Sequence, residues 1–198
     1  MTIEEICRKY WIIDYTINSD GSIDYDGDLN LGSNNLTKLP LKFNKVSGYF
    51  SCGKNKLTSL EGCPKVVGGN FDCSNNKLTS LEGGPKEVGG SFDCGDNKLT
   101  DLKGCPKEIG GSLICYSNKI TSLEFYPEKI SGVFKFYHNP IDSLFYSFKP
   151  DLDIIKAFNS FRILKDGTVN LKRLKYLMTS FNKQNLDIYQ IKKHYQLI

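Results

Sequence analysis

The fold is decided by a 21-residue unit that recurs along the chain. One copy reads Phe71-Asp72-Cys73-Ser74-Asn75-Asn76-Lys77-Leu78-Thr79-Ser80-Leu81-Glu82-Gly83-Gly84-Pro85-Lys86-Glu87-Val88-Gly89-Gly90-Ser91. The residues in register are Cys52, Cys73, Cys94 and Cys115; Asn34, Asn55, Asn76, Asn97, Asn118 and Asn139; Leu36, Leu57, Leu78, Leu99, Ile120 and Ile141; and Leu39, Leu60, Leu81, Leu102, Leu123 and Leu144. Such a fixed period indicates a solenoid, in which stacked coils bury one continuous core.

Each unit is expected to form one coil with a short strand. Phe71 and Cys73 alternate with polar neighbours, which predicts a strand with one buried face. The other inward residues are expected to be Leu78, Leu81, Pro85 and Val88. The unit is too short to hold a helix on the return side. The sequence therefore predicts short parallel strands joined by extended or irregular return segments.

The repeated asparagine has a structural explanation. A buried turn leaves backbone donors and acceptors without partners, and an asparagine side chain carries both kinds of group. We expect Asn76 and its equivalents to bond their own coil and a neighbouring one. A ligand-binding role is a poor alternative for an amide at so regular an inward position.

The order of strand, asparagine and leucine resembles the leucine-rich-repeat consensus, with Phe and Cys where Leu is usual. The repeat length is similar to that of the short bacterial type. Residues 57–65 and 67–78 are similar to repeat proteins encoded by large tailed bacteriophages, and the segments 15–24 and 39–43 also fit that group. The repeat resemblance covers about residues 29–145. It implies a binding scaffold, and it provides no catalytic residues.

Three regions are expected. Residues 1–28 would form an N-terminal helix-hairpin cap: Thr2 to Glu5 is a capping-box sequence, and residues 18–21 are a turn signal between residues 13–17 and 23–31. Residues 29–148 would hold six leucine-rich-repeat units. Residues 149–198 would form a C-terminal α-helical cap of three helices, at 151–164, 170–181 and 187–197, with a turn at 165–167.

Composition excludes several classes of protein. Hydrophobic residues make up 39% of the chain and the mean hydropathy is −0.35, and no apolar run is long enough to span a membrane. The acidic N-terminus does not resemble a secretory signal. The expected location is therefore the cytoplasm, or the host cytoplasm if the chain is phage-encoded. The net charge of +4 is uneven, because residues 151–198 carry nine basic and four acidic side chains.

Reactive chemistry is not expected. The in-register cysteines form a straight column that cannot make a tetrahedral metal site, and Cys63 and Cys105 lie two coils apart, too far for a disulfide. The acidic segment 20–28 fails the calcium-loop pattern, because a serine stands where the last glutamate ligand is needed. The two histidines, His138 and His194, lie in different regions. We therefore predict no catalytic residue, no metal and no cofactor, and hence no enzyme.

The strand face is the best candidate for function. We use this name for three columns of outward residues that vary where the rest of the unit does not. They are Ser51, Asp72, Asp93, Ile114 and Lys135; then Gly53, Ser74, Gly95, Tyr116 and Tyr137; then Lys54, Asn75, Asp96, Ser117 and His138. The predicted partner-binding residues are Asp72, Asp93, Asp96, Ile114, Tyr116, Lys135, Tyr137 and His138. Aromatic residues are enriched in interfaces. An alternative is that these aromatic side chains meet the C-terminal cap.

The leading functional hypothesis is a protein-binding scaffold, a phage product that engages and modulates a host protein such as a defence factor. One alternative is a nucleic-acid binder that uses the basic C-terminal helices. Another is a structural or assembly component of a virion. One column of lysines also recurs in register, at Lys56, Lys77, Lys98 and Lys119. Glutamates from the same coils accompany it, which favours a solvated surface. No oligomeric state follows from the sequence.

Overall fold

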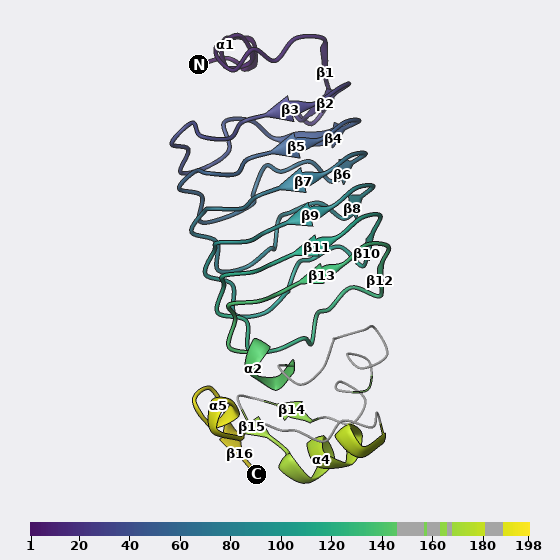
Figure 1. Ribbon diagram of the computed structural model, residues 1–198. Helices are drawn as coiled ribbons and strands as arrows, with labels where there is room; N and C mark the ends of the chain where they lie inside the picture. Colours follow the sequence, from purple (N-terminus) through teal and green to yellow (C-terminus); the bar gives the residue numbers. More distant parts are fainter. Residues whose placement is uncertain (146–156, 158–162, 166–167, 181–187) are drawn as a thin grey trace.

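The computed structural model describes residues 1–145, 157, 163–165, 168–180 and 188–198. Residues 29–141 form a solenoid of stacked coils, each offset from the next by 21 residues (Figure 1). The N-terminal helix lies at one end of the stack and the C-terminal elements lie at the other. The repeat period in the sequence is thus the repeat of the structure.

One side of the solenoid is a six-stranded parallel sheet, in the order β13-β11-β9-β7-β5-β3. Its strands are β3 (Leu29–Asn30), β5 (Phe50–Ser51), β7 (Phe71–Asp72), β9 (Phe92–Asp93), β11 (Leu113–Ile114) and β13 (Phe134–Lys135). Each residue pairs with its equivalent one coil away, as Phe71 does with Phe92. The predicted strand at the start of each unit is therefore confirmed.

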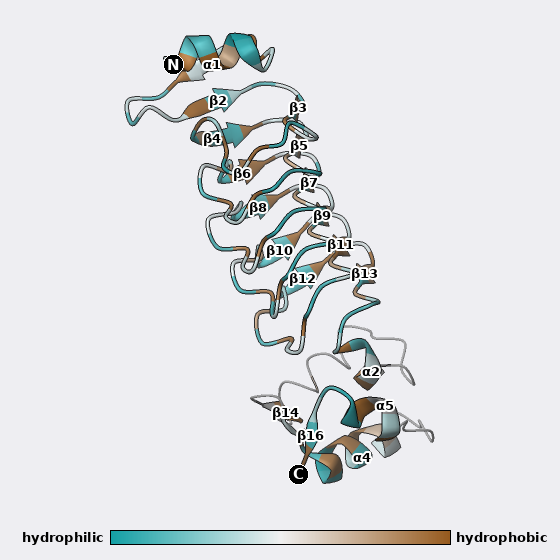
Figure 2. Ribbon diagram, turned by 90° about the vertical axis from the view of Figure 1, so that its left-hand side faces the viewer, coloured by the Kyte–Doolittle hydropathy of each residue, from teal (hydrophilic) through white to brown (hydrophobic). Residues whose placement is uncertain are grey.

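The return side also forms a sheet, so of the extended or irregular return segments that the sequence predicts, the extended alternative holds at these positions. Its seven strands, in the order β1-β2-β4-β6-β8-β10-β12, are β1 (Tyr15–Ile17), β2 (Ile23–Tyr25), β4 (Phe43–Val46), β6 (Val66–Val67), β8 (Glu87–Val88), β10 (Glu108–Ile109) and β12 (Lys129–Ile130). Figure 2 shows labelled strands of this sheet along the left of the solenoid and those of the six-stranded sheet along the right. Two-residue strands between proline and glycine give no alternating pattern, so the sequence did not reveal them.

The core lies between the two sheets and consists of the predicted inward columns. Phe50, Phe71, Phe92, the four in-register cysteines and the leucines at 57, 60, 78, 81, 99 and 102 are all 0% exposed. Neighbouring phenylalanines stack, with ring centroids 5.9 Å apart for Phe50 and Phe71 and 5.0 Å apart for Phe71 and Phe92. A fully buried side chain of this size contributes about 1.5–3 kcal/mol. Each coil thus stabilises its neighbours.

The in-register asparagines, called the asparagine ladder below, form hydrogen bonds within their own coil and to a neighbouring coil, as the sequence predicts. Asn97 Nδ2 donates to the carbonyl oxygens of Cys94 and Gly95 in its own coil, at 3.2 Å each, and to that of Cys73 in the preceding coil at 3.1 Å. Its Oδ1 accepts from the N–H of Leu78 at 2.9 Å. The first asparagine of the series, Asn34, is exposed and differs, because its Nδ2 donates only to the carbonyl of Gly32 among the described residues.

Glycines set the spacing of the coils at the corner after the second sheet. A Cβ atom added to Gly89 would overlap the backbone carbonyl oxygen of Gly68, and one added to Gly110 would overlap that of Gly89. Serine occupies the equivalent place only at the two ends of this series, at Ser47 and Ser131. The interior coils therefore pack too closely there for any side chain.

The N-terminal segment forms the expected helix and hairpin. Helix α1 (Ile3–Lys9) begins with a capping box, in which the Thr2 hydroxyl accepts from the N–H of Glu5 and the Glu5 carboxylate accepts from the N–H of Thr2. Strands β1 and β2 pair antiparallel, and β2 then pairs with β4 of the solenoid. The hairpin thereby continues the seven-stranded sheet.

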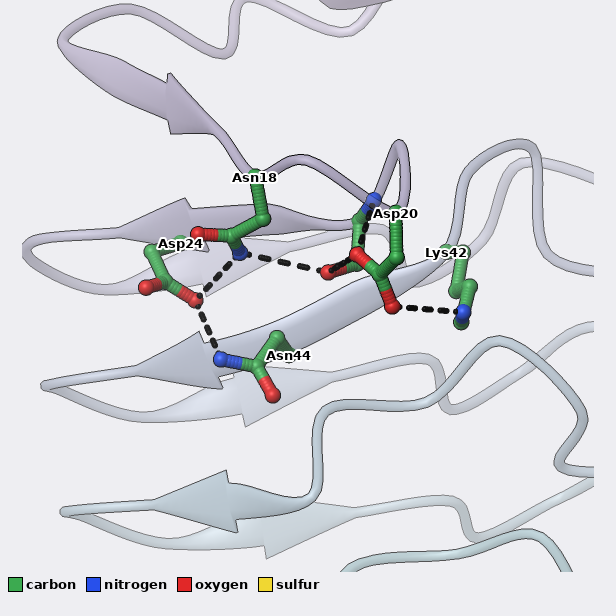
Figure 3. A network of polar contacts seen from close by, with 6 residues as sticks. Asn18, Asp20, Asp24, Lys42 and Asn44 are labelled. Atoms are coloured by element: carbon green, nitrogen blue, oxygen red, sulfur yellow. Dashed lines mark hydrogen bonds and ion pairs between the residues drawn. The ribbon is translucent and has the colours of Figure 1, made fainter.

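The acidic residues of the hairpin form hydrogen bonds and an ion pair within the hairpin and with the first coil (Figure 3). Asp24 Oδ1 accepts from the side-chain amides of Asn18 at 3.2 Å and Asn44 at 2.8 Å. Asp20 accepts from Ser22 and pairs with Lys42 at 2.9 Å, and these donors lower the pKa of the Asp20 carboxyl. These carboxylates therefore bond the chain itself, which gives the acidic segment a structural role.

The C-terminal region departs from the all-helical cap that the sequence predicts. It contains α2 (Asp142–Phe145), α4 (Leu171–Ser180) and α5 (Ile188–Lys192), but also a three-stranded sheet of β14 (Leu164–Lys165), β15 (Thr168–Val169) and β16 (Gln196–Leu197). The expectation of helix through residue 197 is wrong, because β16 pairs with β15. Most of the helix expected at 151–164 lies outside the described residues. No helix within the described part of the chain could cross a membrane.

Candidate protein-binding face

The strand face is formed by the outward positions of the six-stranded sheet and by the turn after each strand. Asp72 follows the buried Phe71 and precedes the buried Cys73, so its side chain points outward. Asp72, Asp93, Ile114 and Lys135 are paired in register on neighbouring strands. The eight predicted binding residues therefore come from four adjacent coils, which brings residues up to 66 positions apart in the chain onto one surface.

Two of the predicted binding residues also shape the backbone. Asp72 Oδ1 accepts from the N–H of Ser74 at 2.9 Å, and Asp93 Oδ1 accepts from the N–H of Gly95 at 2.9 Å. Asp72 Oδ2 accepts from the Ser51 hydroxyl at 2.9 Å. Aspartate commonly bonds the amide two residues further on in a turn. The Asp-x-Ser and Asp-x-Gly patterns were a signal of this role that the sequence reasoning missed.

The third column has an unusual backbone. Lys54, Asn75, Asp96, Ser117 and His138 all lie in the left-handed region, with φ between 50° and 60°. Asparagine, aspartate and histidine adopt this conformation more readily than other residues with a side chain, whereas lysine and serine do so at a cost. The turn that presents these side chains is thus fixed by the coil and does not depend on the residue in it.

Tyr116 and Tyr137 form a stacked pair on this face. Their ring centroids are 5.1 Å apart with an interplanar angle of 5°. The Tyr116 ring lies over Gly95, where a Cβ atom would come within 2.9 Å of the ring, and its hydroxyl bonds the Asp96 carboxylate. The His138 ring packs edge-on against Tyr137, at 5.2 Å. Glycine at position 95 is therefore what lets an aromatic ring lie flat on the surface.

The stacked pair is accessible. Tyr137 is 46% exposed, so the described residues of the C-terminal region leave it open. The described contact between that region and the coils lies elsewhere, where the Tyr195 hydroxyl donates to the carbonyl of Thr121 at 3.3 Å. Within the described residues, the alternative that the C-terminal cap buries the aromatic side chains of the strand face therefore has no support at Tyr137.

Negative charge gathers next to the tyrosines. Burial raises the pKa of the Asp93 carboxyl, and the nearby carboxylates of Asp72 and Asp96 raise it further. Lys135 has the opposite, smaller effect. Within the described residues, the ion pairs closer than 4 Å involve none of these three carboxylates. Like charges side by side on neighbouring strands cost stability, so this part of the face carries negative charge that the ion pairs within the described residues do not neutralise.

The cysteines are packed in the core. Cys52, Cys73, Cys94 and Cys115 are buried, and desolvation raises the pKa of the Cys73, Cys94 and Cys115 thiols well above the ordinary value. Thiols protonated in this way are poor nucleophiles and poor metal ligands. Among the described residues, no group of three or more His, Cys, Asp or Glu side chains is arranged to hold a metal ion.

The structure also has a groove that the sequence reasoning did not anticipate. It runs over the outside of the seven-stranded sheet, has a volume of about 590 Å³ and has Gly68, Gly89 and Gly110 in its floor. Lys86, Lys107, Glu87 and Glu108 line it with mixed charge. It arises where the close packing of the coils excludes side chains. Positive and negative side chains both line the groove, so charge of a single sign is less concentrated there than on the strand face.

Comparison of the sequence and structure with known protein families, curated proteins and solved structures finds no match.

Proposed function

We propose that this solenoid is a non-catalytic scaffold of leucine-rich-repeat type that binds another protein through the strand face. The observation that carries the proposal is the stacked pair of Tyr116 and Tyr137 on an open sheet surface. Tyrosine supplies a large contact area at a low entropic cost, and it is enriched in binding sites. A neighbouring isoleucine, Ile114, adds apolar surface, and charged residues surround the three.

The arrangement of the scaffold supports the same proposal. The inward residues repeat almost unchanged from coil to coil, whereas the strand-face columns change. The first column runs from serine through aspartate and isoleucine to lysine, and the second changes from glycine and serine to tyrosine. A repeat used only for its own stability needs no such gradient. A rigid sheet that holds variable side chains in fixed places is also preorganised, which lowers the cost of binding.

The identity of the partner is a further proposal. The similarity of residues 57–65 and 67–78 to phage repeat proteins favours a chain that acts in an infected bacterial cell and binds a host protein, with a defence factor as the specific expectation. This part of the proposal rests on the resemblance and on no structural observation.

Photocrosslinking tests the proposed function. A benzoylphenylalanine residue at position 137 should crosslink one defined protein in cells that make the chain. The same residue at position 77, on an exposed lysine outside the strand face, is the matched control and should not crosslink that protein. Crosslinking from position 77 alone would move the binding surface. A crosslink to nucleic acid or to virion proteins would favour the alternative functions.

A further inference from the structure

The tyrosine pair offers a partner an apolar surface, whereas the carboxylates beside it offer negative charge. Tyr137 is nearly half exposed and stacks on Tyr116, which gives a flat apolar surface. On its N-terminal side lie Asp93 and Asp96, and the hydroxyl of Tyr116 joins the two features by bonding Asp96. An apolar surface that leads into a cluster of carboxylates is complementary to a side chain with an apolar stem and a cationic end.

These carboxylates have capacity for a further donor. Asp93 uses Oδ1 to accept from the N–H of Gly95, and Asp96 bonds the Tyr116 hydroxyl. Within the described residues, Asp93 Oδ2 accepts no hydrogen bond and neither carboxylate forms an ion pair. Asp72 is the nearest strand neighbour of Asp93, so their charges repel. An incoming cation would relieve that repulsion.

We infer that the strand face recognises a basic segment of its protein partner, in which an arginine or lysine side chain lies along Tyr116 and Tyr137 and places its charge between Asp93 and Asp96. The inference rests on the proposed function and names the chemistry of its partner. Arginine fits best, because its planar guanidinium can donate to two carboxylates at once and can pack on an aromatic ring. Lys135, at the other end of the face, would meet an acidic residue of the same partner.

Other surfaces of the chain fit a basic segment less well. The acidic residues of the N-terminal hairpin already bond Asn18, Ser22, Asn44 and Lys42. The groove over the seven-stranded sheet carries Glu87 and Glu108, but Lys86, Lys107 and Lys129 also line it. The two glutamates therefore provide a control in which the same charge is removed from a different face.

A peptide titration tests the inference. The probe is a capped peptide of three Gly-Arg repeats, and its control carries citrulline, which is neutral and nearly the same shape, in place of arginine. In about 0.15 M salt, the arginine peptide should shift the amide NMR signals of Asp93, Gly95, Asp96 and Tyr116 and saturate. The citrulline peptide should not.

Two charge variants locate the site. Asp93→Asn with Asp96→Asn should weaken peptide binding by about tenfold or more, because asparagine removes the charge and keeps one acceptor oxygen, which can still accept from the N–H of Gly95 at position 93. Glu87→Gln with Glu108→Gln changes the net charge equally and should leave the affinity within about twofold. Equal losses in the two variants, shifts spread over the whole surface, or no binding of the arginine peptide would overturn the inference.

The inference and the proposed function can fail separately. If position 137 crosslinks a partner but Asp93→Asn with Asp96→Asn binds that partner normally, the basic-segment inference is wrong and the scaffold proposal stands. If position 137 crosslinks nothing in cells that make the chain, the proposed function is wrong, whatever the peptide does.

Discussion

Asn97 Oδ1 accepts a hydrogen bond of 2.9 Å from the backbone N–H of Leu78, which belongs to the preceding coil. Through this bond and its amide donors, one side chain joins two coils at a position 9% exposed. This turn belongs to neither a helix nor a sheet. The asparagine side chains therefore supply the hydrogen-bond partners that the backbone groups of the turn would otherwise lack.

The ladder leads to a stability prediction. Asn97→Ala should lower the free energy of unfolding by about 1–3 kcal/mol, because the buried N–H of Leu78 loses its partner and the carbonyls of Cys73, Cys94 and Gly95 each lose one of their donors. Asn97→Leu should not restore it. Asn34→Ala is the control and should cost less than about 0.5 kcal/mol, since Asn34 is exposed. Chemical denaturation measures all three, and equal midpoints for Asn97→Ala and wild type would show that the ladder is dispensable.

The close packing of the glycine corner gives a second prediction. Gly89→Ala should destabilise the protein by about 1–3 kcal/mol, because its Cβ would overlap the carbonyl oxygen of Gly68 and force the coils apart. Ser131→Gly, at the equivalent place in the last coil, should change stability by less than about 1 kcal/mol. Thermal unfolding of the two variants provides the comparison, and a neutral Gly89→Ala would mean that the coils can shift without cost.

The buried thiols predict a pH dependence. In the unfolded chain a cysteine ionises near pH 8.5, whereas burial raises the pKa of Cys73, Cys94 and Cys115 in the folded protein. Above about pH 8.5 the unfolded state therefore releases protons that the folded state keeps, and the free energy of unfolding should fall as pH rises. Below that pH these thiols should have no effect.

Denaturation in a reducing buffer between about pH 8 and 9.5 would measure this slope. Cys94→Ala removes one of the thiols and should make the slope shallower than that of the wild-type protein, whatever it does to the overall stability. A wild-type slope that did not change in Cys94→Ala would assign the pH dependence to other groups. In the native protein, Cys73, Cys94 and Cys115 should also react slowly with a thiol reagent.

The C-terminal region is expected to protect the last coils. Removal of residues 151–198 would take away Tyr195, which bonds the carbonyl of Thr121, and the contact between α2 and α5. Because a solenoid with an open apolar end aggregates, the truncated chain should form large species in light scattering, whereas the full chain should not.

The same region is basic, which leads to a prediction about nucleic-acid binding by the full chain. Lys172, Arg173, Lys175, Lys192 and Lys193 are exposed, so the full chain should bind DNA or RNA at most weakly and lose that binding as salt rises. A stable, monomeric truncated chain, together with tight nucleic-acid binding by the full chain at physiological salt, would move the function to this region.

The repeat period made most of the solenoid predictable. The inward columns, the strand at Phe71 and the asparagine ladder all follow from residues that recur at one spacing, because each coil must present the same groups to the next. The second sheet did not follow, since Glu87 and Val88 form a strand only by pairing with equivalent residues in other coils.

The outward placement of the candidate binding residues was predictable, and their geometry was not. The variable columns identify Tyr116 and Tyr137 as outward residues, but the flat packing of Tyr116 on Gly95 depends on contact between coils. The mixed C-terminal region was missed for a related reason. Strands β14, β15 and β16 have two residues each, which is too short for an alternating pattern. β14 and β15 pair locally, but β15 pairs with β16 28 positions further along the chain.

The central claim, that the strand face binds a protein, is tested most directly by affinity. The partner crosslinked from position 137 would be purified, and its dissociation constant measured with three forms of the chain. Tyr116→Ala with Asp93→Lys should bind at least about tenfold more weakly than wild type, a loss of about 1.4 kcal/mol, while its circular dichroism and unfolding midpoint stay close to those of the wild type. Lys77→Glu with Lys98→Glu, outside the strand face, should bind as wild type does. The opposite pattern, with binding lost only in the lysine variant, would contradict the account.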